Sequence, residues 1–254
     1  MRFEDLVAEA QAVPLRGWDF TWLAGRTTGS DPTWSYPDLA GELLHARVRL
    51  LDIDTGGGEL LASFAPLPAG GIAVEGWAPN VPVARERLEP LGVAVRYAPD
   101  GTLPVEDHSV DLVLNRHGRL DATEVARVLA PGGTLLTQQV GSDDCTGINQ
   151  ALGDPAAETG QALDAPARGG WDARTAADAL TAAGLTVTDV REERPPFTFH
   201  DVGALVYQLR AVPWQVPDFT VERYEAPLRR IHDHIRAHGG FRVHAHRFLI
   251  RARR

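Results

Sequence analysis

Short apolar runs alternate with helical patterns through the first two thirds of the chain. Runs typical of buried strands cover residues 48–53, 71–75, 93–97, 110–115 and 134–140. Between them, apolar spacing predicts helices at 59–64, around 83–91 and at 121–129. The turn 130–133 precedes the fifth run. This β-α alternation predicts an α/β fold with a doubly wound, mostly parallel sheet and right-handed crossovers.

The pattern loosens after Gly141. Residues 153–170 are rich in Ala, Gly, Pro and acids, which predicts a loop or a weak helix. Asp172 is the expected cap of a helix that ends at Ala183, and strands are expected at 185–192 and 241–252. The segment between these strands contains five prolines and a predicted helix that begins at Val202 and ends near Pro213 and Trp214. A stretch of that length over a sheet edge is usually a lid or a binding element.

Composition narrows the function classes. All 25 Lys+Arg residues are arginine, so lysine chemistry of the Schiff-base or P-loop type is excluded. Cys145 is the only cysteine and cannot form an internal disulfide, and the N-terminus lacks an apolar targeting run. We therefore expect a cytoplasmic protein with no membrane association.

Charge argues against a general nucleic-acid binder. The formal net charge is −9, whereas affinity for nucleic acid rests mostly on neutralising phosphates. The segment from Leu228 onward is an exception, with eight arginines and one acid, Asp233. We interpret it first as a solvated helix and strand, and second as an anion or RNA site.

The most informative segment joins a strand to a helix through glycines. Leu50–Ile53 is followed by Asp54, Thr55 and three glycines, Gly56 to Gly58. Glycines there let the backbone approach a ligand closely, and the helix that follows favours a negative group. The dinucleotide pattern G-x-G-x-x-G fails because Leu61 stands in place of the third glycine. Glu75 ends the next strand at 75 − 52 = 23 positions after Asp52, near the roughly 20-residue spacing of a ribose-binding acid.

With these motifs, the stretch from Val48 to Val140 resembles the class I S-adenosylmethionine-dependent methyltransferases, in particular the small-molecule, type 11-like branch. Further matching pieces are Asp100–Pro104, Val110–Val113 and Val128–Gly133. The resemblance implies a Rossmann-like sheet of seven strands, mostly parallel with an antiparallel final strand, and a lid insertion. It also implies S-adenosylmethionine as cofactor. We expect an N-terminal aromatic arm or lid at 1–44, a core at 45–193 and 241–254, and the substrate lid at 194–240.

The resemblance assigns cofactor roles residue by residue. Asp52, Gly56 and Gly58 would line the methionine and sugar part, Glu75 would bind the ribose hydroxyls and Asp100 would face the adenine amine. Asn115 follows the fourth strand and is a further candidate cofactor contact. Trp34 and Tyr36 belong to an aromatic arm with Trp18, Phe20 and Trp22, which either packs in the core or closes over a cationic sulfonium.

Asp54 departs from the family pattern, which usually has glycine there. A carboxylate beside the cofactor's own carboxylate costs binding unless it turns away or meets a cation. This residue keeps open a second interpretation, in which the fold binds S-adenosylmethionine without methylating.

Candidate catalytic and substrate residues follow the carboxyl ends of the strands, where such sheets bind ligands. His117 is the expected general base because its ordinary pKa lies near neutrality, and His200 is the second candidate. We expect Arg116 to lower the pKa of His117. The candidate substrate-binding residues are Arg116, Gln138, Gln139, Tyr207 and Trp214. The alternative for these residues is ordinary loop or core packing.

Five histidines near the end of the chain invite a metal interpretation. On a helix only His234 and His238 would share a face, and no carboxylate or cysteine set accompanies them. We expect no metal. The predicted function is methyl transfer from S-adenosylmethionine to a small molecule. The alternatives are an RNA or protein methyltransferase using the arginine-rich end, and a non-methylating protein that binds or rearranges a ligand.

Overall fold

The computed structural model describes residues 1–15, 20–45, 48–153 and 170–254. They form two compact units, which we describe separately. Unit 1 comprises 1–32, 141–171 and 193–246, and unit 2 comprises 33–140, 172–192 and 247–254. The units divide the chain at other positions than the three predicted ranges, because the N-terminal residues and 141–171 pack with the expected insertion. Trp18 of the predicted arm and nearly all of the predicted loop at 153–170 lie outside the described residues.

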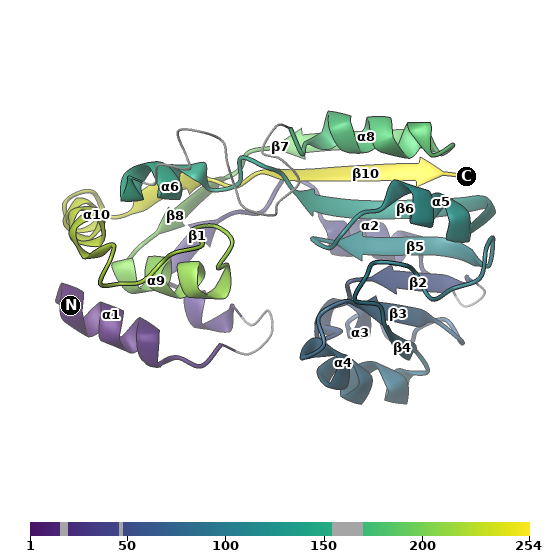
Figure 1. Cartoon of the computed structure of the whole chain (residues 1–254), viewed down its shortest axis with the longest axis horizontal. Helices are drawn as coiled ribbons and strands as arrows, with labels where there is room; N and C mark the ends of the chain where they lie inside the picture. The colour runs from purple at the N-terminus through teal and green to yellow at the C-terminus, as the bar shows by residue number, and fades with distance from the viewer. Residues whose placement is uncertain (16–19, 46–47, 154–169) are drawn as a thin grey trace. The chain divides into compact units, whose positions relative to one another are not determined.

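Unit 2 is built on a seven-stranded sheet in the order β4-β3-β2-β5-β6-β10-β7 (Figure 1). Its strands are β2 (Leu50–Ile53), β3 (Ile72–Glu75), β4 (Ala94–Tyr97), β5 (Val110–Arg116), β6 (Leu129–Val140), β7 (Thr186–Glu193) and β10 (Arg247–Arg253). Strands β4, β3, β2, β5 and β6 pair in parallel, and β10 runs antiparallel to β6. The predicted Rossmann-like, mostly parallel sheet with an antiparallel final strand is confirmed.

Four helices of unit 2 lie within about three residues of their predicted bounds, whereas α2 (Tyr36–Leu43) was not predicted. The four are α3 (Glu59–Ala62), α4 (Asn80–Leu88), which the 3-10 turn η2 (Glu89–Leu91) follows, α5 (Ala122–Val128) and α8 (Ala173–Ala182). Asp121 accepts hydrogen bonds from the backbone of Thr123 and Glu124, and Asp172 forms a capping box with Thr175. These side chains satisfy N–H groups that a helix start leaves without partners.

Strand alternation sorts the residues of this sheet onto two faces. Leu50, Leu112 and Leu136 pack with α2, α3 and α4 in one buried cluster. Because side chains repeat every second residue along a strand, Asp52 and Gln138 point to that same face. Asn115 and Thr137 point to the opposite face, on which α5 and α8 contact β6 and β10.

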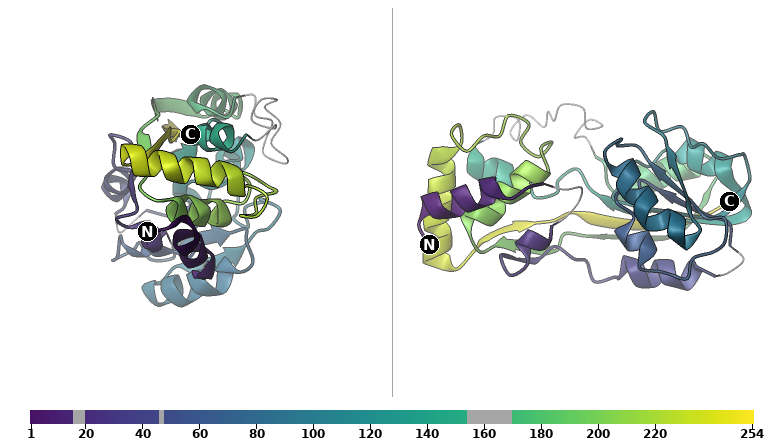
Figure 2. Two further views of the ribbon diagram at one scale, coloured as in Figure 1. Left: turned by 90° about the vertical axis from the view of Figure 1, so that its left-hand side faces the viewer. Right: turned by 90° about the horizontal axis from the view of Figure 1, so that it is seen from below.

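Unit 1 contains a small antiparallel sheet in the order β1-β8-β9. Its elements are α1 (Phe3–Ala12), η1 (Thr21–Leu23), β1 (Thr27–Gly29), α6 (Thr146–Leu152), β8 (Pro196–Phe199), α9 (Val202–Ala211), α10 (Glu225–His238) and β9 (Phe241–His244). Helix α9 contacts α1 and α10 (Figure 2). Phe199, Leu205 and Leu228 are fully buried between these elements and anchor a core of their own.

Three predictions of local structure are wrong in detail. The single strand expected at 241–252 is two strands in different sheets, β9 and β10. The chain leaves one sheet at Ala245 and His246, whose N–H groups bind Pro195 O and the Asp144 carboxylate, and both residues are buried. The apolar alternation therefore continues through the break. The turn expected at 130–133 is an irregular part of β6, and the helix expected to end near Pro213 and Trp214 ends at Ala211. None of the helices in the described residues is long and apolar enough to cross a membrane.

Candidate active site

The loop from β2 to α3 needs its glycines. Gly56 and Gly58 adopt left-handed backbone angles, with φ of 64° and 79°. A Cβ on Gly58 would lie 2.7 Å from the side chain of Leu88, so this glycine also lets α4 pack closely. Arg87 of α4 donates to the carbonyl of Gly57 and, at 2.5 Å, to Glu59 Oε1. The loop is therefore held in shape from the α4 side.

Glu75 joins this loop to the end of β3. Its side chain is 4% exposed, and its two oxygens accept hydrogen bonds from Gly56 N and Trp77 N, both at 2.7 Å. Each carboxylate oxygen keeps a further lone pair that can accept from a hydroxyl. Burial raises the pKa of Glu75, and the negative charge of Asp54 adds to this effect. The predicted ribose acid thus lies in the predicted place beside the glycine loop.

Asp54 turns its carboxylate toward the segment that follows β5. Its Oδ2 accepts a hydrogen bond from Arg119 N at 2.6 Å. The residue has a positive φ of 54°, and a Cβ on Gly118 would lie 2.5 Å from the Asp54 Cβ. Backbone N–H groups of Arg119 and Gly76 bind this carboxylate, and the charge of Arg119 also lowers its pKa. Burial nevertheless raises its pKa.

Three acids therefore surround one end of the loop. The pKa of Asp52 is raised to about 7, mainly by burial and to a smaller extent by the charges of Asp54 and Glu75. A hydrogen bond with Thr55 acts in the opposite direction. Like charges at short range make it costly for all three acids to ionise at once, so a bound cation would be favoured here.

Asp100 lies in the turn after β4. Its Oδ1 accepts from Thr102 N at 3.0 Å, and its carbonyl accepts from the Arg119 guanidinium at 3.0 Å. Arg119 thereby connects this turn with Asp54, a role that sequence reasoning missed. Trp77, which is 55% exposed beside Glu75, was also missed. The signal that would have found Trp77 is its exposure at the end of a strand, and the sequence alone does not show exposure.

Asn115 lies at the centre of a buried amide network on the other face of the sheet. It is fully buried, and its Oδ1 accepts from Thr137 Oγ1 at 2.9 Å and from Gln139 Nε2 at 2.6 Å. Its Nδ2 donates to Ile53 O at 3.2 Å. Both polar atoms of the Asn115 side chain and the Nε2 atom of Gln139 are thus used inside the protein, which favours a supporting role over the predicted ligand contacts.

Trp34 and Tyr36 are core residues of unit 2, with 8% and 2% of their surface exposed. Tyr36 accepts from Asn115 N at 3.1 Å, and its hydroxyl donates to Leu136 O. Burial raises the pKa of this phenol. The structure therefore corrects the prediction of one aromatic arm: Phe20 and Trp22 pack in unit 1, while Trp34 and Tyr36 are buried in unit 2.

His117 follows β5 and joins a chain of hydrogen bonds. Trp34 Nε1 donates to Gln138 Oε1 at 2.8 Å, and Gln138 Nε2 lies 2.9 Å from His117 Nε2. His117 is an exposed residue, and the pKa of its ring is lowered well below the ordinary value of 6.5, first by desolvation and then by the charges of Arg116 and Arg247. The lowering by Arg116 agrees with the expected direction.

The remaining predicted residues belong to unit 1. His200 contacts Thr28 Oγ1 at 2.9 Å and Gly239 O at 3.2 Å. Tyr207 is buried, with its ring 5.0 Å from that of Trp22, whereas Trp214 is 55% exposed. These contacts agree with packing inside unit 1, and the catalytic and substrate roles of the three residues stay predictions.

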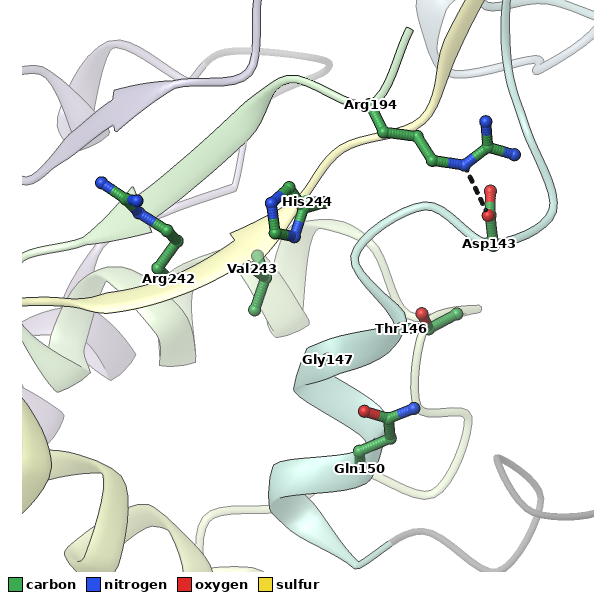
Figure 3. Close-up of a pocket in the computed structure, with 8 residues that line it drawn as sticks. All are labelled: Asp143, Thr146, Gly147, Gln150, Arg194, Arg242, Val243 and His244. Atoms are coloured by element: carbon green, nitrogen blue, oxygen red, sulfur yellow. Dashed lines mark hydrogen bonds and ion pairs between the residues drawn. The ribbon is translucent and has the colours of Figure 1, made fainter.

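Unit 1 also contains a polar pocket with a volume of about 380 Å³ (Figure 3). It is lined by Asp143, Thr146, Gly147, Gln150, Arg194, Arg242, Val243 and His244, none of which was a predicted site residue. Arg194 donates to Asp143 at 2.8 Å inside it.

His234 and His238 stack on one face of α10, as their spacing predicts. Within the described ranges no group of three or more His, Cys, Asp or Glu is arranged to hold a metal.

Comparison with known proteins identifies the central part of this fold. Residues 51–137 match the model of a family described as "Methyltransferase domain". The chain carries a methyltransferase domain. The match covers the glycine loop, Glu75, Asp100 and Asn115, and it confirms the resemblance and the enzyme class, an S-adenosylmethionine-dependent methyltransferase.

Solved structures share the fold of this methyltransferase at low sequence identity. The YcgJ protein of Bacillus subtilis is 19% identical with a TM-score of 0.56, covering 86% of this chain and 97% of its own. A candidate methyltransferase from Bacillus halodurans is 18% identical with a TM-score of 0.58, covering 87% and 99%. The [4+2]-cyclase SpnF is 17% identical with a TM-score of 0.50, covering 99% and 92%. No curated protein sequence matches the chain.

Proposed function

We propose that this chain transfers a methyl group from S-adenosylmethionine to a small molecule. The observation that carries the proposal is the acid-lined glycine loop, in which Asp52, Asp54 and Glu75 surround a turn closed by Gly56 and Gly58. S-adenosylmethionine is cationic at its sulfonium and its amino group, and its sulfonium supplies the methyl. A cationic ligand fits a site in which burial and mutual repulsion raise the pKa values of the acids.

The chain's own residues would bind and orient this cofactor. Glu75 is already fixed by Gly56 N and Trp77 N, so it would meet the ribose hydroxyls without reorganising. Asp100 would face the adenine amine, and the exposed Trp77, two residues after Glu75, could cover a flat ring. Asn115, Trp34 and Tyr36 would support the site from beneath.

Two observations favour a small acceptor over a macromolecule. The net charge of −9 disfavours a general polyanion partner. The arginine-rich end is also divided between the units, with Arg229, Arg230, Arg236 and Arg242 in unit 1 and the others in unit 2. Arg229 is further paired with Glu4 and Glu225. A continuous basic surface does not follow from the run of arginines in the sequence.

The test uses the purified full chain with S-adenosylmethionine labelled in its methyl group. We expect calorimetric binding of the cofactor and of S-adenosylhomocysteine, and transfer of the labelled methyl from S-adenosylmethionine to a small molecule of a cell extract that chromatography separates from the cofactor. Absence of binding by both compounds would refute the proposal. Label that accumulates in RNA or protein instead would establish the macromolecular alternative.

A second candidate is a non-methylating protein that uses the same cofactor site. The observation in its favour is that Gln138 already engages the ring nitrogen of His117 that a general base needs. The fold is compatible with this reading, since it is shared with a protein described as a [4+2]-cyclase. Cofactor binding with no transfer of label into any fraction would support it.

A further inference from the structure

The hydrogen bonds around His117 determine which of its ring nitrogens carries the proton. The indole N–H of Trp34 can only donate, and it lies 2.8 Å from Gln138 Oε1. The same amide must therefore turn its NH₂ group toward His117 Nε2, which lies 2.9 Å away. An amide nitrogen cannot accept a hydrogen bond. His117 Nε2 is thus the acceptor, and the proton of the neutral ring is on Nδ1.

The electrostatic surroundings hold the ring in this neutral form. Protonating Nε2 would place two N–H groups against each other, and Arg116 and Arg247 oppose a further positive charge. The backbone of His117 donates to Gln138 O at 2.7 Å, which fixes the residue in a left-handed conformation with φ of 58°. Among the described residues, Nδ1 has no hydrogen-bond partner, so its N–H group is available to a ligand.

We infer that Trp34 is a positioning residue that acts through Gln138, and that the His117 Nδ1–H group donates a hydrogen bond to an oxygen of the methyl acceptor. This inference rests on the proposed function and specifies its acceptor. His117 then acts as a hydrogen-bond donor and not as the predicted proton acceptor, because the lone pair of its Nε2 atom already accepts from Gln138.

The arrangement also defines the class of acceptor. The molecule carries a carbonyl or carboxylate oxygen, which the Nδ1–H group binds beside the positive charge of Arg116. The atom that receives the methyl offers its lone pair at neutral pH without losing a proton to His117. A simple alcohol, which would need a base, does not fit this description.

The tautomer is measured by nitrogen NMR of the histidine rings in the full chain with S-adenosylhomocysteine. His117→Gln identifies the signal by its loss. We expect a protonated Nδ1 and an unprotonated Nε2 in the unchanged protein. In Trp34→Phe the amide of Gln138 is free to turn its oxygen toward the ring, so the proton should move to Nε2 in a large share of molecules.

Tyr36→Phe is the matched control, because Tyr36 is equally a buried aromatic side chain with a hydrogen bond at this edge, and it has no hydrogen bond to Gln138. It should leave the His117 signals unchanged. A protonated Nε2 in the unchanged protein, or identical spectra for both variants, overturns the positioning role. If Trp34→Phe does not fold, Gln138→Glu decides: a carboxylate accepts from both neighbours, so the pKa of His117 should rise by about 1 unit or more.

The acceptor class is tested by titrating two probes of equal size, propionate and propylammonium. Propionate should shift the Nδ1–H signal of His117, whereas propylammonium should not. An equal response to both probes, or none to propionate, overturns the acceptor class. Binding of S-adenosylhomocysteine is followed in the same samples. Its absence refutes the proposed function while the tautomer measurement still decides the role of Trp34.

Discussion

The carboxyl edge of the seven-stranded sheet has two chemically different halves. At the ends of β2 and β3, charged carboxylates gather around a glycine loop, and burial raises their pKa values. At the ends of β5 and β6, neutral amides and an imidazole bind one another, centred on Asn115 and Gln138. In the first half the negative charges repel one another. In the second half the polar side chains bind other groups of the protein.

This difference separates two tasks. A bound cationic ligand offsets the repulsion among the buried acids, so substitutions in this half should change ligand affinity. A closed polar network contributes mainly to the free energy of unfolding and to the placement of its few outward-facing atoms. Substitutions in the two halves should therefore change different measurements.

The largest expected effect is on stability, from Asn115→Leu. Leucine has a similar size but leaves Thr137, Gln139 and the carbonyl of Ile53 without their buried partner. We expect the free energy of unfolding to fall by about 3 kcal/mol, since each buried group left unpaired costs about 1–3 kcal/mol. Urea titration of the full chain measures it. Thr137→Val, which removes the hydrogen bonds of Thr137 with Asn115 and Gln139, should cost less, about 1–2 kcal/mol. If the two variants lower the free energy of unfolding equally, the hydrogen bonds of Asn115 do not act together as a network.

The next effect is on cofactor affinity, from Glu75→Ala. The change removes a charged acceptor that holds the glycine loop and faces the expected ribose. Affinity for S-adenosylhomocysteine should fall by about 1.5–3 kcal/mol, as calorimetry measures, because hydrogen bonds to charged groups are worth about that much. Glu86→Ala, an exposed position on α4, is the control. Undiminished affinity in Glu75→Ala would move the ribose site elsewhere.

Sequence reasoning succeeded where local signals and chain geometry coincide. The cap Asp172 and the helix start at Asp121 act within three residues of their own position. Glu75 binds Gly56 N only 19 positions away, and both lie at the ends of neighbouring strands. The sheet type, seven strands with an antiparallel final strand, came from the resemblance and is confirmed. The order of the strands was not predicted, because local pattern does not specify which strands are neighbours.

Sequence reasoning failed where partners come from distant segments. Asp54 stands out as a departure in the sequence, yet its partner, Arg119 N, lies 65 positions further along. The Trp34–Gln138 contact spans 104 positions, so nothing near His117 indicates that its lone pair is engaged. The division of 241–252 between two sheets was missed for a related reason, since the break at Ala245 and His246 is buried and contains no glycine or proline.

A third expected effect is a pH dependence that belongs to the charged half alone. The pKa of Asp52 is raised to about 7 in the folded protein, so ionisation of this group destabilises the fold. Its contribution to the free energy of unfolding is complete below pH 3.8 and is lost as the pH rises through 7. A cation binds the ionised form, so affinity for S-adenosylmethionine should rise about tenfold from pH 6 to pH 8. Calorimetry at both values tests this. Asp52→Asn should flatten the dependence, and a slope that persists in this variant would assign the titration to another group.

The smallest expected effect concerns the shape of the glycine loop. Arg87 donates to Gly57 O and Glu59 without being placed to touch the ligand, so Arg87→Ala should only loosen the loop. We expect affinity for S-adenosylhomocysteine to fall about two- to fivefold, the range of a partly exposed ion pair plus one backbone hydrogen bond. Arg85→Ala is the matched control, because Arg85 lies on the same helix and pairs with Glu89 instead. If both variants bind equally, the acids and the glycines alone shape the loop, and the charged half of the edge does not depend on α4. If only Arg87→Ala binds S-adenosylhomocysteine more weakly, α4 contributes to the shape of the ligand site through Arg87.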